Sequence, residues 1–271
     1  MPAKPKAPGR PAAASGKGGC VVSLQTEIRA LVEAKVERAN GRDFYRKPLV
    51  GFSSAADPLY ATFKEVVGPH HLLPEEVLPG VATLVSFFVP FSRMVVDANR
   101  RERDVPAREW VDSYAHANDL IDEIGGEMAA MLEAGGVRAG MVNSTNNYDE
   151  TILKAPWSHR SAAFVAGLGR FGLNRMLITP VGAAGRFGTV FLAEALPPSP
   201  RSEEERCLFF RDGSCGYCRK CCPAQALGRG PDGFDRHACN RRLLDVTPYS
   251  RSLGWELDVC GKCDVGPCAV F

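Results

Sequence analysis

Cysteine is the residue with the clearest chemical signature in this chain. Nine of the ten cysteines lie between Cys207 and Cys268. Thiols at this density form disulfides, bind zinc or ligate iron–sulfur clusters, and their spacing helps to distinguish the three. We therefore expect the chemistry in the C-terminal part of the chain, with the preceding part as its platform.

The spacing fits iron–sulfur clusters best. In the bacterial two-cluster pattern C-x2-C-x2-C-x3-C-P, three cysteines hold one four-iron cluster, and the fourth, before proline, holds the other. The run from Cys215 to Cys221 matches the first three positions, but Cys222 and its proline then follow without the x3 gap. Counting back from Cys222 instead makes Cys218 and Cys215 the preceding ligands. This register assigns the first ligand to Cys207 and leaves Cys221 as a spare.

The register predicts eight ligands for two [4Fe–4S] clusters. The first set in sequence is Cys207, Cys215, Cys218 and Cys222, and the second is Cys239, Cys260, Cys263 and Cys268. In such sites the last cysteine of a set crosses to the other cluster. One cluster is then expected on Cys207, Cys215, Cys218 and Cys268, and the other on Cys222, Cys239, Cys260 and Cys263.

Two other interpretations of the cysteines stay open. Cys-Gly-Tyr-Cys and Cys-Gly-Lys-Cys are also knuckles of a zinc ribbon, which needs only two such pairs and leaves four cysteines unexplained. Disulfides are disfavoured because we see no secretory leader and the chain is too long to need covalent staples.

Composition indicates a globular protein. The chain has 271 residues, 45% of them hydrophobic, which suffices for one large or two modest domains. Its 33 basic and 31 acidic residues give a net charge of +2, which indicates neither nucleic acid nor an anionic membrane as partner. No apolar run approaches the roughly 18 residues of a membrane span. We expect a cytoplasmic protein without membrane contact.

We expect three regions. Residues 1–20 are rich in Pro, Ala, Gly and Lys and lack acidic residues, which predicts a disordered tail with Cys20 as a bystander at its edge. Residues 21–196 are predicted to form an α/β substrate domain. Residues 197–271, after the prolines at 197–200, are predicted to form a ferredoxin-like double-cluster domain.

Hydrophobic periodicity predicts an α/β or α+β fold with a mixed sheet. We expect the first helix to begin after an N-cap at Ser23 and to end near Asn40. Further helices are predicted at 59–67, 110–132 and 158–165. Strands are predicted at 48–52, 81–89, 137–142, 176–179 and 189–192. The last two strands are expected to pair as a hairpin across a turn at 182–188.

A polar loop is a candidate ligand site. It runs from Asn143 to Glu150 after a predicted strand, where open α/β sheets usually bind ligands, although a solvated loop is the plain alternative. Its polar residues are Asn143, Asn146, Asn147, Tyr148, Asp149 and Glu150. His159 is a second candidate, with a position on a helix surface as the alternative.

The glycines Gly167, Gly169 and Gly172 spell G-x-G-x-x-G. The dinucleotide fingerprint needs a strand before the glycines and a helix after them, whereas here the predicted order is reversed. We therefore do not predict a nucleotide site. We expect this turn to let the backbone approach a flat ligand instead.

Several segments together resemble the epoxyqueuosine reductase family, and more closely its shorter relatives with a double-cluster domain. They are Ala166-Gly-Leu-Gly169, Phe171-Gly-Leu-Asn174, Met176-Leu-Ile-Thr179, Cys-Gly-Tyr-Cys with Cys222-Pro, and Cys260-Gly-Lys-Cys263. The resemblance covers residues 80–271. It implies an α/β domain similar to the corrinoid-binding part of reductive dehalogenases, and a ferredoxin-like module that feeds electrons to cobalamin.

The chain departs from this family in three ways. An ungapped count puts Leu153 where the reductase carries an acidic catalytic residue, and the family's Gly-Lys-Asn-Thr becomes Gly172-Leu-Asn174-Arg175. The chain also stops at Phe271, where full-length reductases continue into a helical-repeat segment that helps to hold transfer RNA. We therefore do not expect tRNA as a partner.

The sequence thus predicts an iron–sulfur oxidoreductase that relays electrons through two [4Fe–4S] clusters to a corrinoid, such as cobalamin, or to a small molecule. A ferredoxin or flavodoxin is the expected redox donor. The residues expected at the cofactor are Asn143, Tyr148, His159, Gly167, Gly169, Gly172 and Asn174. The alternatives are a non-catalytic ferredoxin-type carrier that docks a redox partner and a zinc-stabilised interaction module.

Overall fold

The computed structural model describes residues 23–144, 148–228 and 233–271. The predicted disordered tail and Cys20 lie outside this part of the chain, as do Asn146 and Asn147 of the polar loop. Across the described residues, every helix is too short or too polar to cross a membrane.

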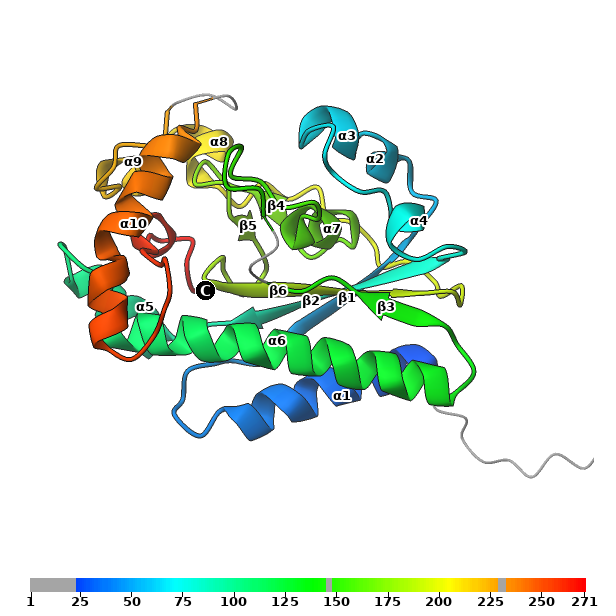
Figure 1. The fold of residues 1–271 in the computed structure, drawn as a ribbon. Coiled ribbons are helices and arrows are strands. Elements are labelled where there is room, and N and C mark those ends of the chain that lie inside the picture. Colours follow the sequence, from blue (N-terminus) through cyan, green and yellow to red (C-terminus); the bar gives the residue numbers. More distant parts are fainter. Residues whose placement is uncertain (1–22, 145–147, 229–232) are drawn as a thin grey trace, which may run out of the picture.

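A four-stranded sheet forms the centre of the molecule (Figure 1). Its order is β1 (Leu49–Ser54), β2 (Thr83–Pro90), β6 (Gly185–Leu192) and β3 (Ala139–Met141). All eight residues of β2 are buried, because β2 lies between two neighbours and both of its faces are covered. The predicted combination of helices and sheet is confirmed. The mixed sheet is corrected, since each described strand pair is antiparallel; alternating helices and strands in a sequence do not fix strand direction.

The predicted hairpin between the strands at 176–179 and 189–192 is wrong. β5 (Leu177–Ile178) pairs with β4 (Arg170–Phe171) in a separate small sheet, whereas β6 begins at Gly185 and pairs with β2 and β3. The glycines that suggested a turn lie inside the strand for a packing reason. A Cβ atom on Gly188 would lie 2.2 Å from the Phe87 ring, so glycine makes room for an aromatic side chain on the neighbouring strand.

Two long helices cover one face of the sheet (Figure 1). They are α1 (Leu24–Ala39) and α6 (Arg108–Ala134), which contribute Ile28, Val32, Ile121, Ile124 and Met128 to the main core. The predicted caps of the first helix are confirmed, because the Ser23 side chain accepts the Thr26 N–H and Asn40 is the C-cap.

Short helices cover the opposite face. The predicted helix at 59–67 is divided into α2 (Pro58–Ala61) and α3 (Phe63–Val66), and α7 (His159–Val165) matches its prediction. The sequence analysis missed α4 (Pro74–Val77) and α5 (Arg93–Arg101). Helix α4 has four residues and α5 has nine, so neither is long enough to repeat a helical pattern several times.

The cysteine-rich segment forms α8 (Leu208–Asp212), α9 (Tyr217–Lys220), α10 (Arg236–Ser252) and the short 3-10 helix η1 (Lys262–Asp264). It packs directly on the rest of the chain: Val259, Val265 and Ala269 belong to the same core as Trp110. The N–H groups of Ala183 and Ala184 also donate to the carbonyl oxygens of Cys268 and Ala269, at 2.9 and 3.1 Å. The last residues therefore align beside the segment that leads into β6.

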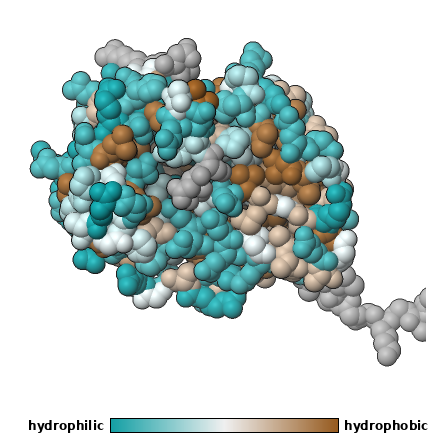
Figure 2. Space-filling view, in the orientation of Figure 1, coloured by the Kyte–Doolittle hydropathy of each residue, from teal (hydrophilic) through white to brown (hydrophobic). Residues whose placement is uncertain are grey.

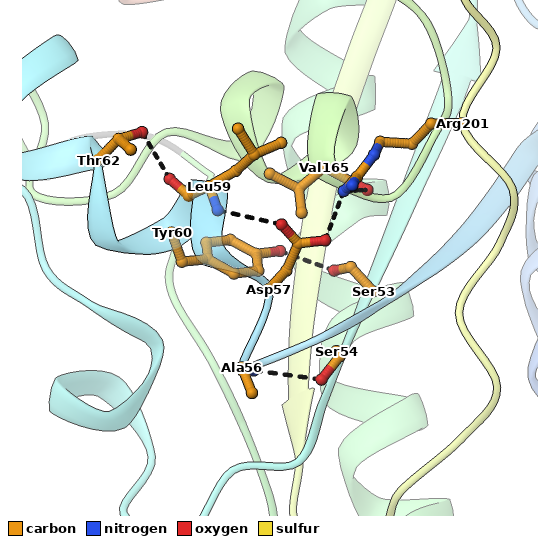
Figure 3. Close-up of polar contacts among 9 residues, drawn as sticks. All are labelled: Ser53, Ser54, Ala56, Asp57, Leu59, Tyr60, Thr62, Val165 and Arg201. Atoms are coloured by element: carbon orange, nitrogen blue, oxygen red, sulfur yellow. Dashed lines mark hydrogen bonds and ion pairs between the residues drawn. The ribbon is translucent and has the colours of Figure 1, made fainter.

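A polar cluster anchors the linker that leads to the cysteines (Figure 3). Arg201 of this linker lies 2.5 Å from the Asp57 carboxylate, which also accepts the Leu59 N–H and so caps α2. Beside it, the hydroxyl groups of Ser53 and Tyr60 form a buried hydrogen bond of 2.7 Å.

We predict that Tyr60→Phe lowers the free energy of unfolding by about 1–2 kcal/mol, because it leaves the buried Ser53 hydroxyl without its partner. Urea titration measures the change. Ser53→Ala together with Tyr60→Phe should cost less than the sum of the two single changes. Additive costs would show that the hydroxyl pair contributes nothing.

Candidate functional site

The structure brings four distant cysteines around one pocket. Cys207, Cys215, Cys218 and Cys268 line a small pocket of about 30 Å3. Leu173, Asn174 and Tyr217 complete much of its wall, and Cys263 also borders it. Cys268 reaches this pocket from the end of the chain because its backbone is bonded to Ala183.

A second cysteine group lies beside the first. Burial, together with the neighbouring thiols of Cys222 and Cys260, raises the pKa of Cys239 to about 11. Burial also raises the pKa of Cys263 well above its usual value, with Cys260, Cys239 and Cys222 among its electrostatic neighbours. These mutual effects place the four thiols Cys222, Cys239, Cys260 and Cys263 near one another.

Cys221 and Cys222 are adjacent but have different surroundings. The Cys221 S–H donates to the carbonyl oxygen of Lys262 at 2.9 Å. The Cys222 sulfur instead accepts the Ala226 N–H at 3.4 Å. One thiol is therefore engaged with the backbone as a donor, while the other is an acceptor, as a thiolate ligand must be.

None of the nine described cysteines forms a disulfide. Within residues 23–144, 148–228 and 233–271, no group of three or more His, Cys, Asp or Glu side chains is close enough to hold one metal ion. Burial raises the pKa of Cys218 to about 11 and that of Cys268 to about 12. Thiols with such pKa values are protonated at neutral pH, so any metal that binds them must displace protons.

The end of α5 clamps the turn between Cys260 and Cys263. The ammonium group of Lys262, only 4% exposed, donates to the carbonyl oxygens of Asn99 and Glu102, each at 2.9 Å, and to the Asn99 side-chain oxygen at 2.8 Å. The Asn99 amide in turn donates to the Cys260 carbonyl at 3.1 Å. A cation at the C-terminal end of a helix is favourable because it bonds otherwise unpaired carbonyls.

Gly261 lets this turn lie flat against α6. Its φ is +69°, and a Cβ atom there would lie 2.2 Å from the Trp110 ring. The sequence analysis missed Asn99, Lys262 and Trp110, because their partners are more than 100 positions away along the chain and no motif joins them.

We predict that Gly261→Ala lowers the free energy of unfolding by about 3 kcal/mol, because it adds a clash with Trp110 to a strained backbone. Gly213→Ala is the matched control. Gly213 also has a positive φ, +74°, but nothing lies within 4 Å of its would-be Cβ, so its cost should be about 1 kcal/mol. Equal losses in urea titrations would rule out the packing role of Gly261.

His159 belongs to a cluster of polar groups, here called the polar chamber, which also includes Asn143, Thr189, Tyr114 and Arg186. Its Nδ1 lies 3.0 Å from the Thr189 hydroxyl, and its Nε2 lies 3.4 Å from the Asn143 carbonyl oxygen. Burial lowers the pKa of His159 to about 4, so the ring is neutral at physiological pH. Arg186 lies over the Tyr114 ring at 4.2 Å, donates to its hydroxyl at 2.6 Å, and reaches the Ser144 carbonyl at 3.4 Å.

The cysteine-rich segment contributes to the same chamber. Burial raises the pKa of Tyr148, and the carboxylate of Asp258 raises it further. Burial also raises the pKa of Asp258, while the charge of Arg186 opposes the shift, so Asp258 interacts electrostatically with both Tyr148 and Arg186. The structure thus brings the predicted residues Asn143, Tyr148 and His159 to one region.

The predicted role of the three glycines is corrected. A Cβ on Gly167 would lie 2.4 Å from the Pro200 oxygen, and one on Gly169 would lie 2.4 Å from the Ile178 oxygen. A Cβ on Gly172 would meet the Ile178 side chain at 2.7 Å. Their open faces are therefore filled by the protein itself, and they do not offer a surface to a flat ligand.

Asn174 lies with the cysteines and not in the chamber. Its side chain is 3% exposed and its amide donates to the Cys263 carbonyl at 3.0 Å and to the Asp264 carboxylate at 3.4 Å. This residue connects the glycine turn to the second cysteine group.

The Asp149 carboxylate of the polar loop is not set up to donate a proton. It accepts the N–H groups of Thr151 and Ile152, and these hydrogen bonds lower its pKa.

The fold and the cysteine groups define a class: an α+β platform with a ferredoxin-like cysteine module packed on it. No protein-family model and no curated protein matches the chain. Several solved structures, however, are similar to it in fold. An epoxyqueuosine reductase with a tRNA-Tyr epoxyqueuosine-modified stem loop gives a TM-score of 0.53 at 19% identity, over 89% of this chain and 66% of that one.

Two reductive dehalogenase structures are also similar. The catabolic enzyme NpRdhA with 3-bromo-4-hydroxybenzoic acid gives a TM-score of 0.60 at 20% identity, over 96% of this chain and 34% of that one. A structure described with a mechanism for B12-dependent dehalogenation gives 0.51 at 20% identity, over 80% and 28%. The predicted resemblance of fold to epoxyqueuosine reductase and to reductive dehalogenases is confirmed. This chain spans about two thirds of the first neighbour and about one third of the others.

Proposed function

We propose that the protein is an iron–sulfur oxidoreductase that binds two [4Fe–4S] clusters. One cluster is held by Cys207, Cys215, Cys218 and Cys268, and the other by Cys222, Cys239, Cys260 and Cys263. One observation supports the proposal: Cys207, Cys215, Cys218 and Cys268, which are far apart in sequence, line one pocket, and Cys222, Cys239, Cys260 and Cys263 interact electrostatically with one another.

The donor sets fit four-iron clusters better than zinc. Tetrahedral zinc with Zn–S bonds of 2.3 Å holds its sulfurs about 3.8 Å apart. A single zinc site would leave four of these eight thiols without a metal, whereas two four-iron clusters use all eight. When bound, such clusters supply one-electron transfer at a potential that hydrogen bonds to sulfur help to set.

The chain's own residues position the ligands. Ala226 donates its N–H to the Cys222 sulfur, and such bonds stabilise a thiolate. Asn99 and Lys262 fix the Cys260 turn, and Asn174 holds the carbonyl of Cys263. The module therefore offers its sulfurs from a backbone that is already bonded in place.

We predict about eight irons per chain after anaerobic preparation, and that Cys221→Ser retains all of them, because the Cys221 S–H is bonded to the Lys262 carbonyl. Cys222→Ser should lose a cluster, or about half of the iron. Iron analysis and absorption spectra measure both variants.

The Cys221→Ser and Cys222→Ser variants also show which of the two adjacent cysteines is a ligand. Loss of iron from Cys221→Ser with retention in Cys222→Ser would reverse the assignment. Stoichiometric zinc in the wild-type protein, without thiolate-to-iron absorption, would exclude the clusters and favour the zinc-stabilised interaction module.

We further propose that the polar chamber around His159 binds the electron acceptor, a small molecule or a corrinoid such as cobalamin. Two features support this: the chamber combines groups from the platform and the cysteine segment, and one fold neighbour is described as B12-dependent. Arg186, whose Nε–H has no partner among the described residues, and the Tyr148 hydroxyl offer hydrogen bonds to such a ligand, and His159 and Asn143 hold each other in place beside them.

Epoxyqueuosine reduction is not part of the proposal. Leu153 cannot donate a proton, and the nearby Asp149 carboxylate is occupied by two backbone N–H groups. An epoxyqueuosine reductase neighbour was solved with a tRNA stem loop. Because position 153 of this chain is a leucine, we do not expect tRNA as its partner.

We predict that cobalamin binds the cluster-loaded protein. Its addition should change the absorption spectrum of the protein, and cobalamin should elute together with the protein on a sizing column. Arg186→Ala should weaken this binding about tenfold, because it removes a donor from the chamber. Lys47→Ala, a change at an exposed residue outside the chamber, is the control. Iron-loaded protein that neither retains cobalamin nor changes its spectrum would leave the electron-carrier alternative.

A further inference from the structure

We propose that one arginine-rich end of the molecule is the docking surface for a small acidic electron-carrier protein. This arginine face consists of α5 with the loop after it, residues 93–108, and of α10, residues 236–251. The proposal rests on the proposed function, because it assigns the point where electrons enter the cluster module.

Charge is unevenly distributed over the chain. The two segments of the arginine face carry nine arginines and four carboxylates, whereas the whole chain has a net charge of only +2. The rest of the protein is therefore slightly acidic. In Figure 1, α5 and α10 lie together at the left end of the molecule, and Figure 2 shows hydrophilic side chains projecting along that edge.

Three exposed arginines of this face have no partner among the described residues. Arg101, Arg103 and Arg241 are exposed and form no ion pair or hydrogen bond with any residue that the structure describes. By contrast, Arg100 is paired with Asp97 and Arg251 with Glu256. Unpaired guanidinium groups are free to meet carboxylates on another protein.

The arginine face contacts the cluster-binding turn directly. Lys262, between the ligands Cys260 and Cys263, donates to the Glu102 carbonyl, and Arg100 donates to the Val265 carbonyl at 2.7 Å. On the other side, Arg242 of α10 donates to the Asp104 carbonyl, which joins the two segments of the face. α10 also carries Cys239. A protein seated here would thus lie one layer of residues from the second cysteine group.

An apolar side chain lies among these charges. Leu244 is 58% exposed and stands three residues, about one helical turn, after Arg241 on α10. An apolar centre with a charged rim is usual for protein interfaces, and weak electron-transfer encounters need little area. Leu244 and the nearby cluster ligands favour a protein partner over RNA, which would use the arginines alone.

Electrostatic complementarity would act mainly on the rate of encounter. Opposite charges steer two proteins together and raise the association rate, and salt screens the effect. Each encounter transfers one electron from the carrier to a cluster and forms no covalent bond. The charge of the arginine face should therefore affect reduction by a protein donor but not reduction by a small reagent.

The test compares two charge reversals of equal size. In the Arg101→Glu/Arg103→Glu variant, the change lies on the arginine face; in the Arg38→Glu/Lys47→Glu control, it affects exposed residues around α1. The probe is flavodoxin in its fully reduced form, which carries the acidic surface expected of the partner. Stopped-flow absorbance measures cluster reduction at low and at high salt, and dithionite measures the reducibility of the clusters independently.

We expect the arginine-face variant to be reduced by flavodoxin about tenfold more slowly at low salt, with the difference lost at high salt. The control should stay within about twofold of wild type, and dithionite should reduce all three proteins equally. Equal slowing in both variants would overturn the docking surface, as would failure of flavodoxin to reduce wild-type clusters that dithionite reduces. Salt-sensitive binding of a stem-loop RNA, lost only in the arginine-face variant while flavodoxin reduction is unchanged, would assign the face to RNA. Wild-type protein without iron would instead refute the proposed function.

Discussion

The arrangement of the cysteines depends on one buried cation. Lys262 stands between two cysteines and directs its ammonium group into the carbonyl oxygens at the end of α5. No carboxylate of the described residues forms an ion pair with it, so three oxygen acceptors alone offset the cost of its burial. Gly261 beside it presses on Trp110 of α6, and Asn99 holds the Cys260 carbonyl. Through these contacts the cysteine turn and the helical layer form one core.

Much of the fold was predictable from local signals. The Ser23 cap, the buried strand at 81–89 and the long helix that follows have patterns that burial on one or both faces imposes. The antiparallel sheet was not predictable, because strand direction depends on long connections. Gly185 and Gly188 led to the wrong prediction of a turn at 182–188. In sequence, a glycine that makes room for an aromatic ring on the next strand looks the same as a glycine in a turn.

The candidate site was predictable to the extent that it depends on spacing. Spacing predicts the two groups of cysteines, and in the structure Cys207, Cys215, Cys218 and Cys268 line one pocket together with Cys263. Spacing could not reveal Arg186, Tyr114 or Asp258, which reach the chamber from three separate elements. Sequence spacing also grouped Asn174 with the glycine turn and His159, whereas its side-chain amide donates to the carbonyl oxygen of Cys263. Such assignments depend on the tertiary packing of short segments that have no periodicity of their own.

The backbone conformation at position 153 favours some side chains over others. Leu153 has a φ of +52°, a left-handed conformation that leucine rarely adopts and that aspartate and asparagine adopt more readily. It stands where the resemblance to epoxyqueuosine reductases places an acidic residue. The loop therefore has a main-chain shape better suited to an acid than to the side chain it carries. The backbone at position 153 therefore already favours a Leu153→Asp substitution.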